Sequence, residues 1–155
     1  MALSTQAFAD EAFIPDKYAY QGIGQNLSIP FEWTSPPQGT KSLALLIVDL
    51  HPIAKNWIHW MVVDLPPSRR DLPEGISGTR EMPGEEKRNS FGEKGYGGPM
   101  PPPGSGPHLY QTTLFALSVP TLSLKDKPSY QEFLAAVHGK VLAQSSWKGA
   151  FQRTQ

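Results

Sequence analysis

The sequence predicts a mainly β fold, an antiparallel β-sandwich with one C-terminal helix. Residues 42–49 carry apolar side chains on both faces, as a strand inside a sandwich does, and residues 57–65 are rich in aromatic and β-branched residues. Residues 109–119 form a third segment of this kind. The helical pattern comes late, after residue 129, so strands and helices do not alternate as they would in a βαβ fold.

Residues 42–49, SLALLIVD, are the clearest strand. Period-two alternation places the odd-numbered residues from Leu43 to Asp49 on one face, so a carboxylate ends an otherwise apolar row at the rim of the sheet. In residues 57–65, the same alternation groups His59 with the other odd-numbered residues, Trp57, Met61 and Val63.

Two further segments have strand character. In the long strand over residues 109–119, Tyr110 shares a face with His108, which precedes it by two residues. Residues 27–34 form a strand that Pro30 interrupts. Because proline cannot donate to a ladder of hydrogen bonds, we expect this strand at a sheet edge or a bulge.

The helix begins with a capping box. Ser129 and Glu132 have the required spacing, and apolar residues then recur at helical intervals from Leu134 to Val141. We expect Gly139 to break or end this helix. The tail that follows, residues 145–152, is short enough for a last turn or a closing strand.

Residues 66–107 are an unusual connection, with nine prolines and nine glycines. A structureless loop of this length is uncommon in a compact domain unless it has a function. Within it, the glycines of residues 95–110 can turn amide N–H groups inward to form a concavity for an anion, while the prolines fix the walls. An ordinary surface loop is the alternative interpretation.

Composition limits the functions that are open to this protein. A chain of 155 residues fits one domain, residues 1–155, and a formal net charge of zero argues against a nucleic acid or an anionic membrane as the main partner. The absence of cysteine excludes disulfides and thiol chemistry and suits a reducing compartment. The N-terminus lacks the pattern of a secretion signal, and no apolar run could cross a bilayer. We therefore expect a cytoplasmic protein that is not an integral membrane protein.

Four polar residues stand near strand ends beside loops, namely Asp49, His59, His108 and Tyr110. Each alone has an ordinary structural explanation. A carboxylate at a strand end often caps a turn, and a histidine in a strand is often a half-buried, hydrogen-bonded ring. Their significance depends on whether they converge.

Several unusual motifs occur in a fixed order along the chain. They are FEWTSPPQGTKSLALLIVD, WIHWMVVDLP, LPEGISG, NSFGEKGYGGPMPPPGSGPHLY, TTLFAL and VLAQSSWKGAFQR. Together they resemble the phosphatidylethanolamine-binding protein family, in its bacterial and archaeal Raf kinase inhibitor-like branch, over nearly the whole chain. The resemblance implies a Greek-key β-sandwich with a small pocket for phosphate-like anions, including the head group of phosphatidylethanolamine.

The resemblance also implies which residues line this pocket. They are the strand-end acid, a histidine in the second strand, the histidine–tyrosine pair after the loop, the wall prolines, the glycine that starts the loop and an aromatic residue at the mouth. In this chain these positions are Asp49, His59, His108, Tyr110, Pro101, Pro102, Gly98 and Trp57.

The chain departs from the family pattern in two places. Where the family has Asp-Pro-Asp-Ala-Pro, the chain reads Asp49-Leu50-His51-Pro52-Ile53, so His51 replaces the second acid. Met100 stands where a small residue or cysteine is common, which narrows the cavity. Because an imidazole replaces a carboxylate, we predict tighter anion binding below about pH 6.5, the usual histidine midpoint.

The first functional hypothesis is a binding protein without catalytic activity, metal or cofactor. Asp49 would orient one imidazole, and His59 and His108 would donate to the anion. Tyr110 would add a hydroxyl, and backbone N–H groups near Gly98 to Met100 would complete the site. Its ligand would be a small phosphorylated molecule, a phospholipid head group or a phosphorylated partner. The resemblance also implies inhibition of a protein kinase or protease, and a homodimer.

Two other hypotheses stay open from the sequence. The first is an enzyme, dependent on a metal or on a His/Asp pair, that acts on a small anionic substrate. Ligand spacings such as HxH or HExxH, which would favour a metal, do not occur. The second is a scaffold that binds a protein partner through residues 66–107, with an incidental pocket.

Overall fold

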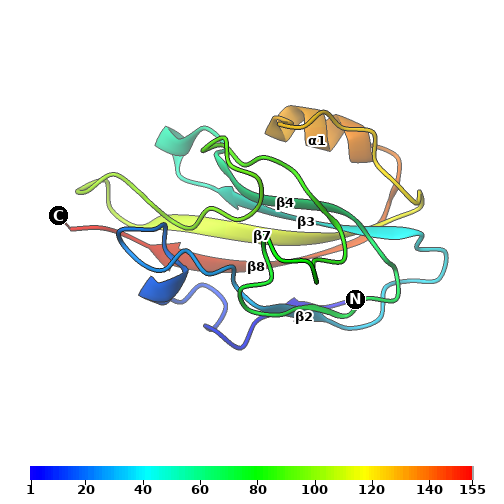
Figure 1. Cartoon of the computed structure of the whole chain (residues 1–155), viewed down its shortest axis with the longest axis horizontal. Helices are drawn as coiled ribbons and strands as arrows, with labels where there is room; N and C mark the ends of the chain where they lie inside the picture. The colour runs from blue at the N-terminus through cyan, green and yellow to red at the C-terminus, as the bar shows by residue number, and fades with distance from the viewer. Residues whose placement is uncertain (155) are drawn as a thin grey trace.

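The computed structural model describes residues 1–154, and Gln155, the last residue of the predicted domain, lies outside them. Two antiparallel sheets and one α-helix make up the fold (Figure 1). The small sheet has the order β1 (Leu3–Ser4), β2 (Phe31–Trp33), β5 (Asp71–Leu72). The large sheet has the order β6 (Glu85–Glu86), β4 (Ile58–Leu65), β3 (Ser42–Asp49), β7 (His108–Leu117), β8 (Val141–Phe151). The helix is α1 (Tyr130–Val137), and two 3₁₀ turns occupy Asp16–Tyr18 and Pro52–Ala54. The expected mainly β, antiparallel fold is confirmed.

The large sheet has Greek-key order. Strands β3, β4 and β6 lie side by side, and β7 returns on the other side of β3, so the spatial order is that of a Greek key. The connection from β6 to β7 carries the Pro/Gly-rich segment. It therefore delivers the start of β7 to the same end of the sheet at which β3 finishes.

Two apolar cores lie on opposite faces of the large sheet. The first fills the space between the sheets and includes Leu43, Leu45 and Ile47 of β3 with Phe31 of β2. The second lies under α1, which contributes the fully buried Phe133. Figure 1 shows α1 and the small sheet on opposite sides of the large sheet. Asp49 ends the row that faces the first core, as the alternation of β3 predicts.

The edge placement of the strand near Pro30 is wrong. Only Phe31–Trp33 forms a strand, β2, and it lies between β1 and β5 in the centre of the small sheet. Pro30 stands just before the strand, so its missing N–H costs no ladder hydrogen bond. Both edges of β2 can therefore pair.

The alternation expected for β4 is also wrong, because β4 contains a bulge. Near the start of β4, the consecutive residues Ile47 and Val48 of β3 pair with Trp60 and Ile58 of β4. His59, between the latter two, is therefore the extra residue of the bulge. The bulge turns His59 to the side of Trp60, which belongs to the core between the sheets. Met61 and Val63 face the core under α1 instead, and Trp57 precedes the strand.

The capping box is confirmed, but the helix is shorter than its apolar pattern suggests. The Ser129 side chain accepts from the Glu132 amide, and the Glu132 carboxylate accepts from the Ser129 amide. The helix ends at Val137, and Gly139 adopts φ +78°. Val141 then begins β8, so the tail is a closing strand of 11 residues. Within residues 1–154, no helix has both the length and the apolar character needed to span a bilayer.

Candidate functional site

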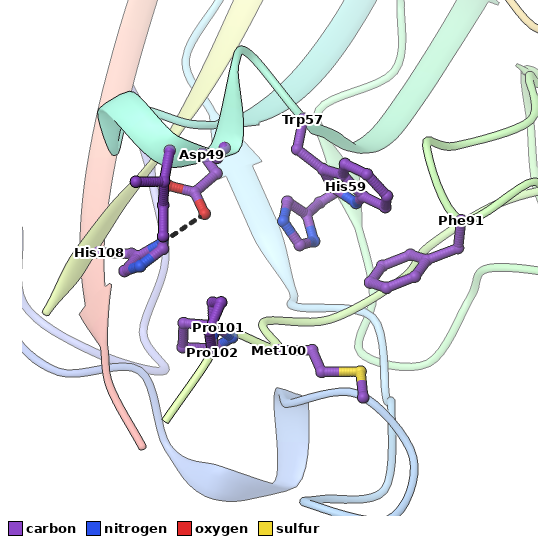
Figure 2. Close-up of a pocket in the computed structure, with 10 residues that line it drawn as sticks. Asp49, Trp57, His59, Phe91, Met100, Pro101, Pro102 and His108 are labelled. Atoms are coloured by element: carbon purple, nitrogen blue, oxygen red, sulfur yellow. Dashed lines mark hydrogen bonds and ion pairs between the residues drawn. The ribbon is translucent and has the colours of Figure 1, made fainter. Parts of the chain in front are cut away.

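A cavity of about 330 Å³ opens at the end of the large sheet where β3 finishes, β4 begins and β7 begins. This volume is at the small end of the range for small-molecule sites. Figure 2 shows the side chains around it. They are Asp49, Ile53, Ala54, Trp57, His59, Phe91, Met100, Pro101, Pro102 and His108.

The structure brings most of the predicted site residues to this one cavity. Its walls include Asp49, Trp57, His59, Met100, Pro101, Pro102 and His108. The other three, His51, Gly98 and Tyr110, lie behind the walls, as described below. Residues that are far apart in sequence therefore converge on one cavity, as residues of a single binding site must.

Asp49 is buried, and both of its carboxylate oxygens accept hydrogen bonds. Oδ2 lies 2.7 Å from Nδ1 of His108, and Oδ1 accepts from the His51 amide at 2.8 Å. The ladder between β3 and β7 pairs Asp49 with Tyr110. His108, two residues before Tyr110, thereby comes within hydrogen-bond distance of the Asp49 carboxylate. The charge of Asp49 is thus used inside the protein, to orient one imidazole and to hold the turn that follows β3.

His108 has no free ring nitrogen. Nδ1 faces the Asp49 carboxylate, which can only accept, so Nδ1 carries a proton. Nε2 lies 2.9 Å from the hydroxyl of Ser105. Donation from His108 to a ligand therefore stays a prediction, and it would require Ser105 to give up this contact.

His51 lies against the far face of His108. The two rings stack with centroids 3.9 Å apart and 16° between their planes. Nδ1 of His51 accepts from the Ile53 amide at 3.2 Å and caps the short Pro52–Ala54 turn. The residue that replaces the family's second acid therefore covers His108 and does not line the cavity.

His59 presents an unprotonated nitrogen. Its Nδ1 lies 2.7 Å from the Gly97 carbonyl oxygen, which can only accept, so Nδ1 is the protonated nitrogen. Burial lowers the pKa of His59, although the Gly97 carbonyl and the charge of Asp49 act in the opposite direction. The neutral ring is thus favoured. Its Nε2 makes no hydrogen bond to any part of the chain that the structure describes.

Tyr110 lies behind the cavity wall with an unpaired hydroxyl. Its ring is edge-on to His59, with centroids 5.0 Å apart, and parallel to His108 at 6.3 Å. Burial, and then the charge of Asp49, raises the pKa of Tyr110, so the phenol stays neutral. The Asp49 carboxylate lies close enough to the hydroxyl to contribute to this shift but outside hydrogen-bond geometry. Among residues 1–154, its hydroxyl is the one buried side-chain nitrogen or oxygen without a partner. Such a group is costly in a folded protein and points to a ligand.

The rim segment, residues 95–107, forms one wall but does not offer the amides that the glycines suggest. The Gly97 N–H donates to the carbonyl of His59, and the Gly98 N–H donates to the side chain of Asn26 at 2.7 Å. Gly98 is needed for packing instead, because a Cβ there would overlap the Tyr18 carbonyl. The expected role of the Gly98 amide as a ligand donor is therefore wrong.

Sequence reasoning missed several residues of the site. Phe91 packs edge-on against His59 and Trp57 and lines the cavity. As a lone aromatic residue in a glycine-rich loop, it carried a weak signal. Arg153 was also missed. Its Nε donates to the carbonyl of Pro101 in the rim segment, and its charge lowers the pKa of Tyr110 against the effect of burial.

The remaining residues of the site were not predicted to belong to it, although Ile53 and Ser105 lie within segments that correspond to motifs of the family that the chain resembles. Ile53 and Ala54 belong to the short turn after β3 and line the mouth. Ser105 reaches His108 only because the rim segment folds back. Within residues 1–154, no group of three or more His, Cys, Asp or Glu side chains is arranged to hold a metal ion.

Comparison with known proteins gives a consistent family. Residues 4–152 match the family model described as phosphatidylethanolamine-binding protein. A UPF0098 protein of Methanothermobacter thermautotrophicus is 36% identical over 155 residues, which cover 99% of both chains. The UPF0098 protein YbhB of Escherichia coli is 33% identical over 158 residues and covers 97% of this chain and 99% of its own.

Solved structures are similar over almost the whole chain. Escherichia coli YbcL, described as a new member of the mammalian PEBP family, has a TM-score of 0.89 at 26% identity, with 97% of each chain covered. CT736 of Chlamydia trachomatis has a TM-score of 0.83 at 30% identity, with 98% of this chain and 97% of its own covered.

Proposed function

Because this chain belongs to the phosphatidylethanolamine-binding protein family, we propose that it binds, without turnover, a small ligand through a phosphate-like group. The binding site is the cavity at the end of β3, β4 and β7. The observation that supports this most strongly is the buried Tyr110 hydroxyl, which has no partner within the described chain. The Arg153 charge near Tyr110 favours a negative ligand group.

The walls of the cavity suit a small group held at its polar end. Trp57, Phe91 and Met100 are large apolar or aromatic side chains around the opening. Such walls exclude water and strengthen the few polar contacts inside. A phosphate ester or a phospholipid head group offers the same chemistry to this site. Inhibition of a kinase or protease stays a hypothesis that the family resemblance suggests.

Titration calorimetry with inorganic phosphate tests this proposal. We expect saturable binding with one site per chain. Tyr110→Phe should raise the dissociation constant about tenfold, the loss expected for one hydrogen bond to a charged group. Tyr130→Phe, a matched change on α1 away from the cavity, should leave affinity unchanged. Absence of phosphate binding to the unmodified protein would contradict the proposal.

One observation favours a second candidate, a hydrolase that uses a serine. Asp49, His108 and Ser105 form a hydrogen-bonded series with distances of 2.7 and 2.9 Å, in the order found in serine hydrolases. The Ser105 hydroxyl also donates to the Pro102 carbonyl at 2.7 Å, which competes with proton transfer to His108. Ser105 is moreover not among the residues that line the cavity. Binding without turnover is therefore our first proposal.

Hydrolysis of para-nitrophenyl acetate separates the two candidates. A hydrolase would show a steady-state rate that Ser105→Ala abolishes, together with labelling of Ser105 by a fluorophosphonate. A binding protein would show no rate above that of Ser105→Ala and would still bind phosphate.

A further inference from the structure

The free polar atoms around the cavity are mainly hydrogen-bond acceptors rather than donors. His59 is held by the Gly97 carbonyl with its proton on Nδ1, which leaves the lone pair of Nε2 without a partner in the described chain. The proton on Nδ1 of His108 is used by Asp49, and Nε2 meets Ser105. The Gly97 and Gly98 amides also donate their hydrogen bonds within the protein, to the His59 carbonyl and the Asn26 side chain. An anion therefore finds few hydrogen-bond donors in the cavity wall.

The charged groups around His59 do not supply the missing proton. Asp49 on β3 already accepts two hydrogen bonds. From β7, His108 and Tyr110 face His59, and Tyr110 is a neutral phenol with a raised pKa. His51 is shielded from the cavity by the His108 ring. The proton that satisfies Nε2 of His59 must come with the ligand or from solvent.

This distinction matters for two tetrahedral anions of nearly the same size. At pH 8 inorganic phosphate is mainly a dianion that still carries one O–H group, whereas sulfate is a dianion without a proton. The phosphate O–H can donate to Nε2 of His59 while its charged oxygens accept from Tyr110. A sulfate oxygen would meet the Nε2 lone pair with a lone pair of its own, unless His59 first took up a proton.

We propose that the cavity selects oxyanions that carry their own proton, because Nε2 of His59 accepts a hydrogen bond from the ligand. This inference rests on the proposed binding function and defines the chemical class of its ligand. A site that accepts from a ligand O–H discriminates against an analogue without it, since its own acceptor is then left unpaired inside the occupied cavity.

The size of the preference follows from the cost of protonating His59. To bind sulfate, His59 must become protonated, and even at the usual histidine pKa of about 6.5 only about one ring in thirty is protonated at pH 8. Burial lowers the pKa of His59, so the protonated fraction is smaller still. For bound complexes of equal stability, phosphate should therefore bind about 30-fold more tightly than sulfate at pH 8.

The test is a pair of titrations of the intact chain with sodium phosphate and sodium sulfate at pH 8 and matched ionic strength. We expect the 30-fold preference and no proton uptake when phosphate binds, measured in two buffers of different ionisation enthalpy. Equal affinities for the two anions would overturn the inference but leave the binding function in place. Phosphate binding with uptake of one proton would overturn it in the same way. Absence of binding by both would overturn the proposed function as well.

A substitution at His59 tests whether this side chain is the source of the preference for phosphate. His59→Gln places an amide at this position that can turn either its donor or its acceptor to the ligand, so the ratio of the two affinities should fall toward one. His138→Gln changes an exposed histidine after α1 and should keep the ratio. If His59→Gln does not fold, ¹⁵N NMR of the unmodified protein still decides. The Nδ1-protonated tautomer of His59 at pH 8 is expected, and the Nε2-protonated tautomer or the imidazolium would overturn the inference.

Discussion

Asp49 is a buried carboxylate whose two oxygens meet two donors, and its ionised form is what keeps both satisfied. In Asp49→Asn, the amide N–H₂ faces either the His108 ring N–H or the His51 N–H, so one donor loses its partner. We predict a loss of about 1–3 kcal/mol in the free energy of unfolding, measured with urea. Asp126→Asn is a suitable control.

The control removes a carboxylate of a different kind. Asp126 pairs with Arg88 at the surface, where its side chain is 68% exposed, and such pairs contribute about 1 kcal/mol at most. If Asp49→Asn were no more costly than Asp126→Asn, Asp49 would not be holding His108 in place.

His59 makes stability depend on pH in a defined direction. Burial lowers its pKa in the folded chain, whereas the unfolded chain titrates near pH 6.5. As the pH falls below this value, only the unfolded chain takes up the proton, so stability falls by at most about 1.4 kcal/mol per pH unit. His59→Gln lacks this contribution. The stability lost through this substitution should therefore be larger at pH 7.5 than at pH 5.5, as measured by urea unfolding.

His138→Gln provides the comparison for that measurement. The side chain of His138 is exposed, so its replacement should change stability equally at both pH values. A cost of His59→Gln that grew toward pH 5.5 would show that the folded chain protonates His59 readily.

At the residue scale, the sequence located the groups of the site but not the direction of their hydrogen bonds. The pairing of Asp49 with His108 follows from strand register, which alternation reveals. The predicted donors Gly98 and His108 already have partners within the protein, namely Asn26 and Ser105. Such partners come from loops whose paths have no periodic signal.

At the scale of elements, the rim segment depends on a close backbone contact. The Pro99 carbonyl accepts from the Tyr20 amide at 3.0 Å, and next to it Gly98 leaves no room for a Cβ beside the Tyr18 carbonyl. Gly98→Ala must therefore push the rim segment away from residues 18–20. We predict a loss of at least about 2 kcal/mol in stability, measured with urea, and weaker phosphate binding.

A second glycine in the same segment separates crowding from backbone conformation. At Gly104 a Cβ would meet nothing within 4 Å, but φ is +79°, so Gly104→Ala should cost only about 1 kcal/mol of strain. Similar losses for the two variants would mean that the contact with Tyr18 is not what fixes the rim.

The sequence predicted an element well where one physical signal dominated. Residues 42–49 are apolar throughout, and they form β3 with the expected bounds. The bulge at His59 left no signal, because it depends on how β4 pairs with β3. Strand β8 was predicted only in part, since VLAQSSWKGAF has few β-branched residues and its first half is largely exposed. Its pairing with β7 holds it in place.

At the scale of the whole molecule, β8 is the outer strand of the large sheet, and the N-terminal segment covers half of its free edge. The Glu11 amide donates to the Lys148 carbonyl at 2.7 Å, and the Ile14 amide donates to the Ala150 carbonyl at 2.8 Å. The first residues of the chain thus protect the edge next to the strand end that carries the cavity, since Phe151 pairs with His108.

Deletion of residues 2–12 should therefore have two effects. It removes the buried Leu3 and several edge hydrogen bonds, for which we predict a loss on the order of 3 kcal/mol in the free energy of unfolding with urea. It also exposes N–H and C=O groups of β8 that can pair with another chain. Sedimentation velocity over a range of concentrations should then show self-association beyond that of the full chain. If the shortened chain associated no more than the full chain, the N-terminal segment would contribute packing but no protection of the edge.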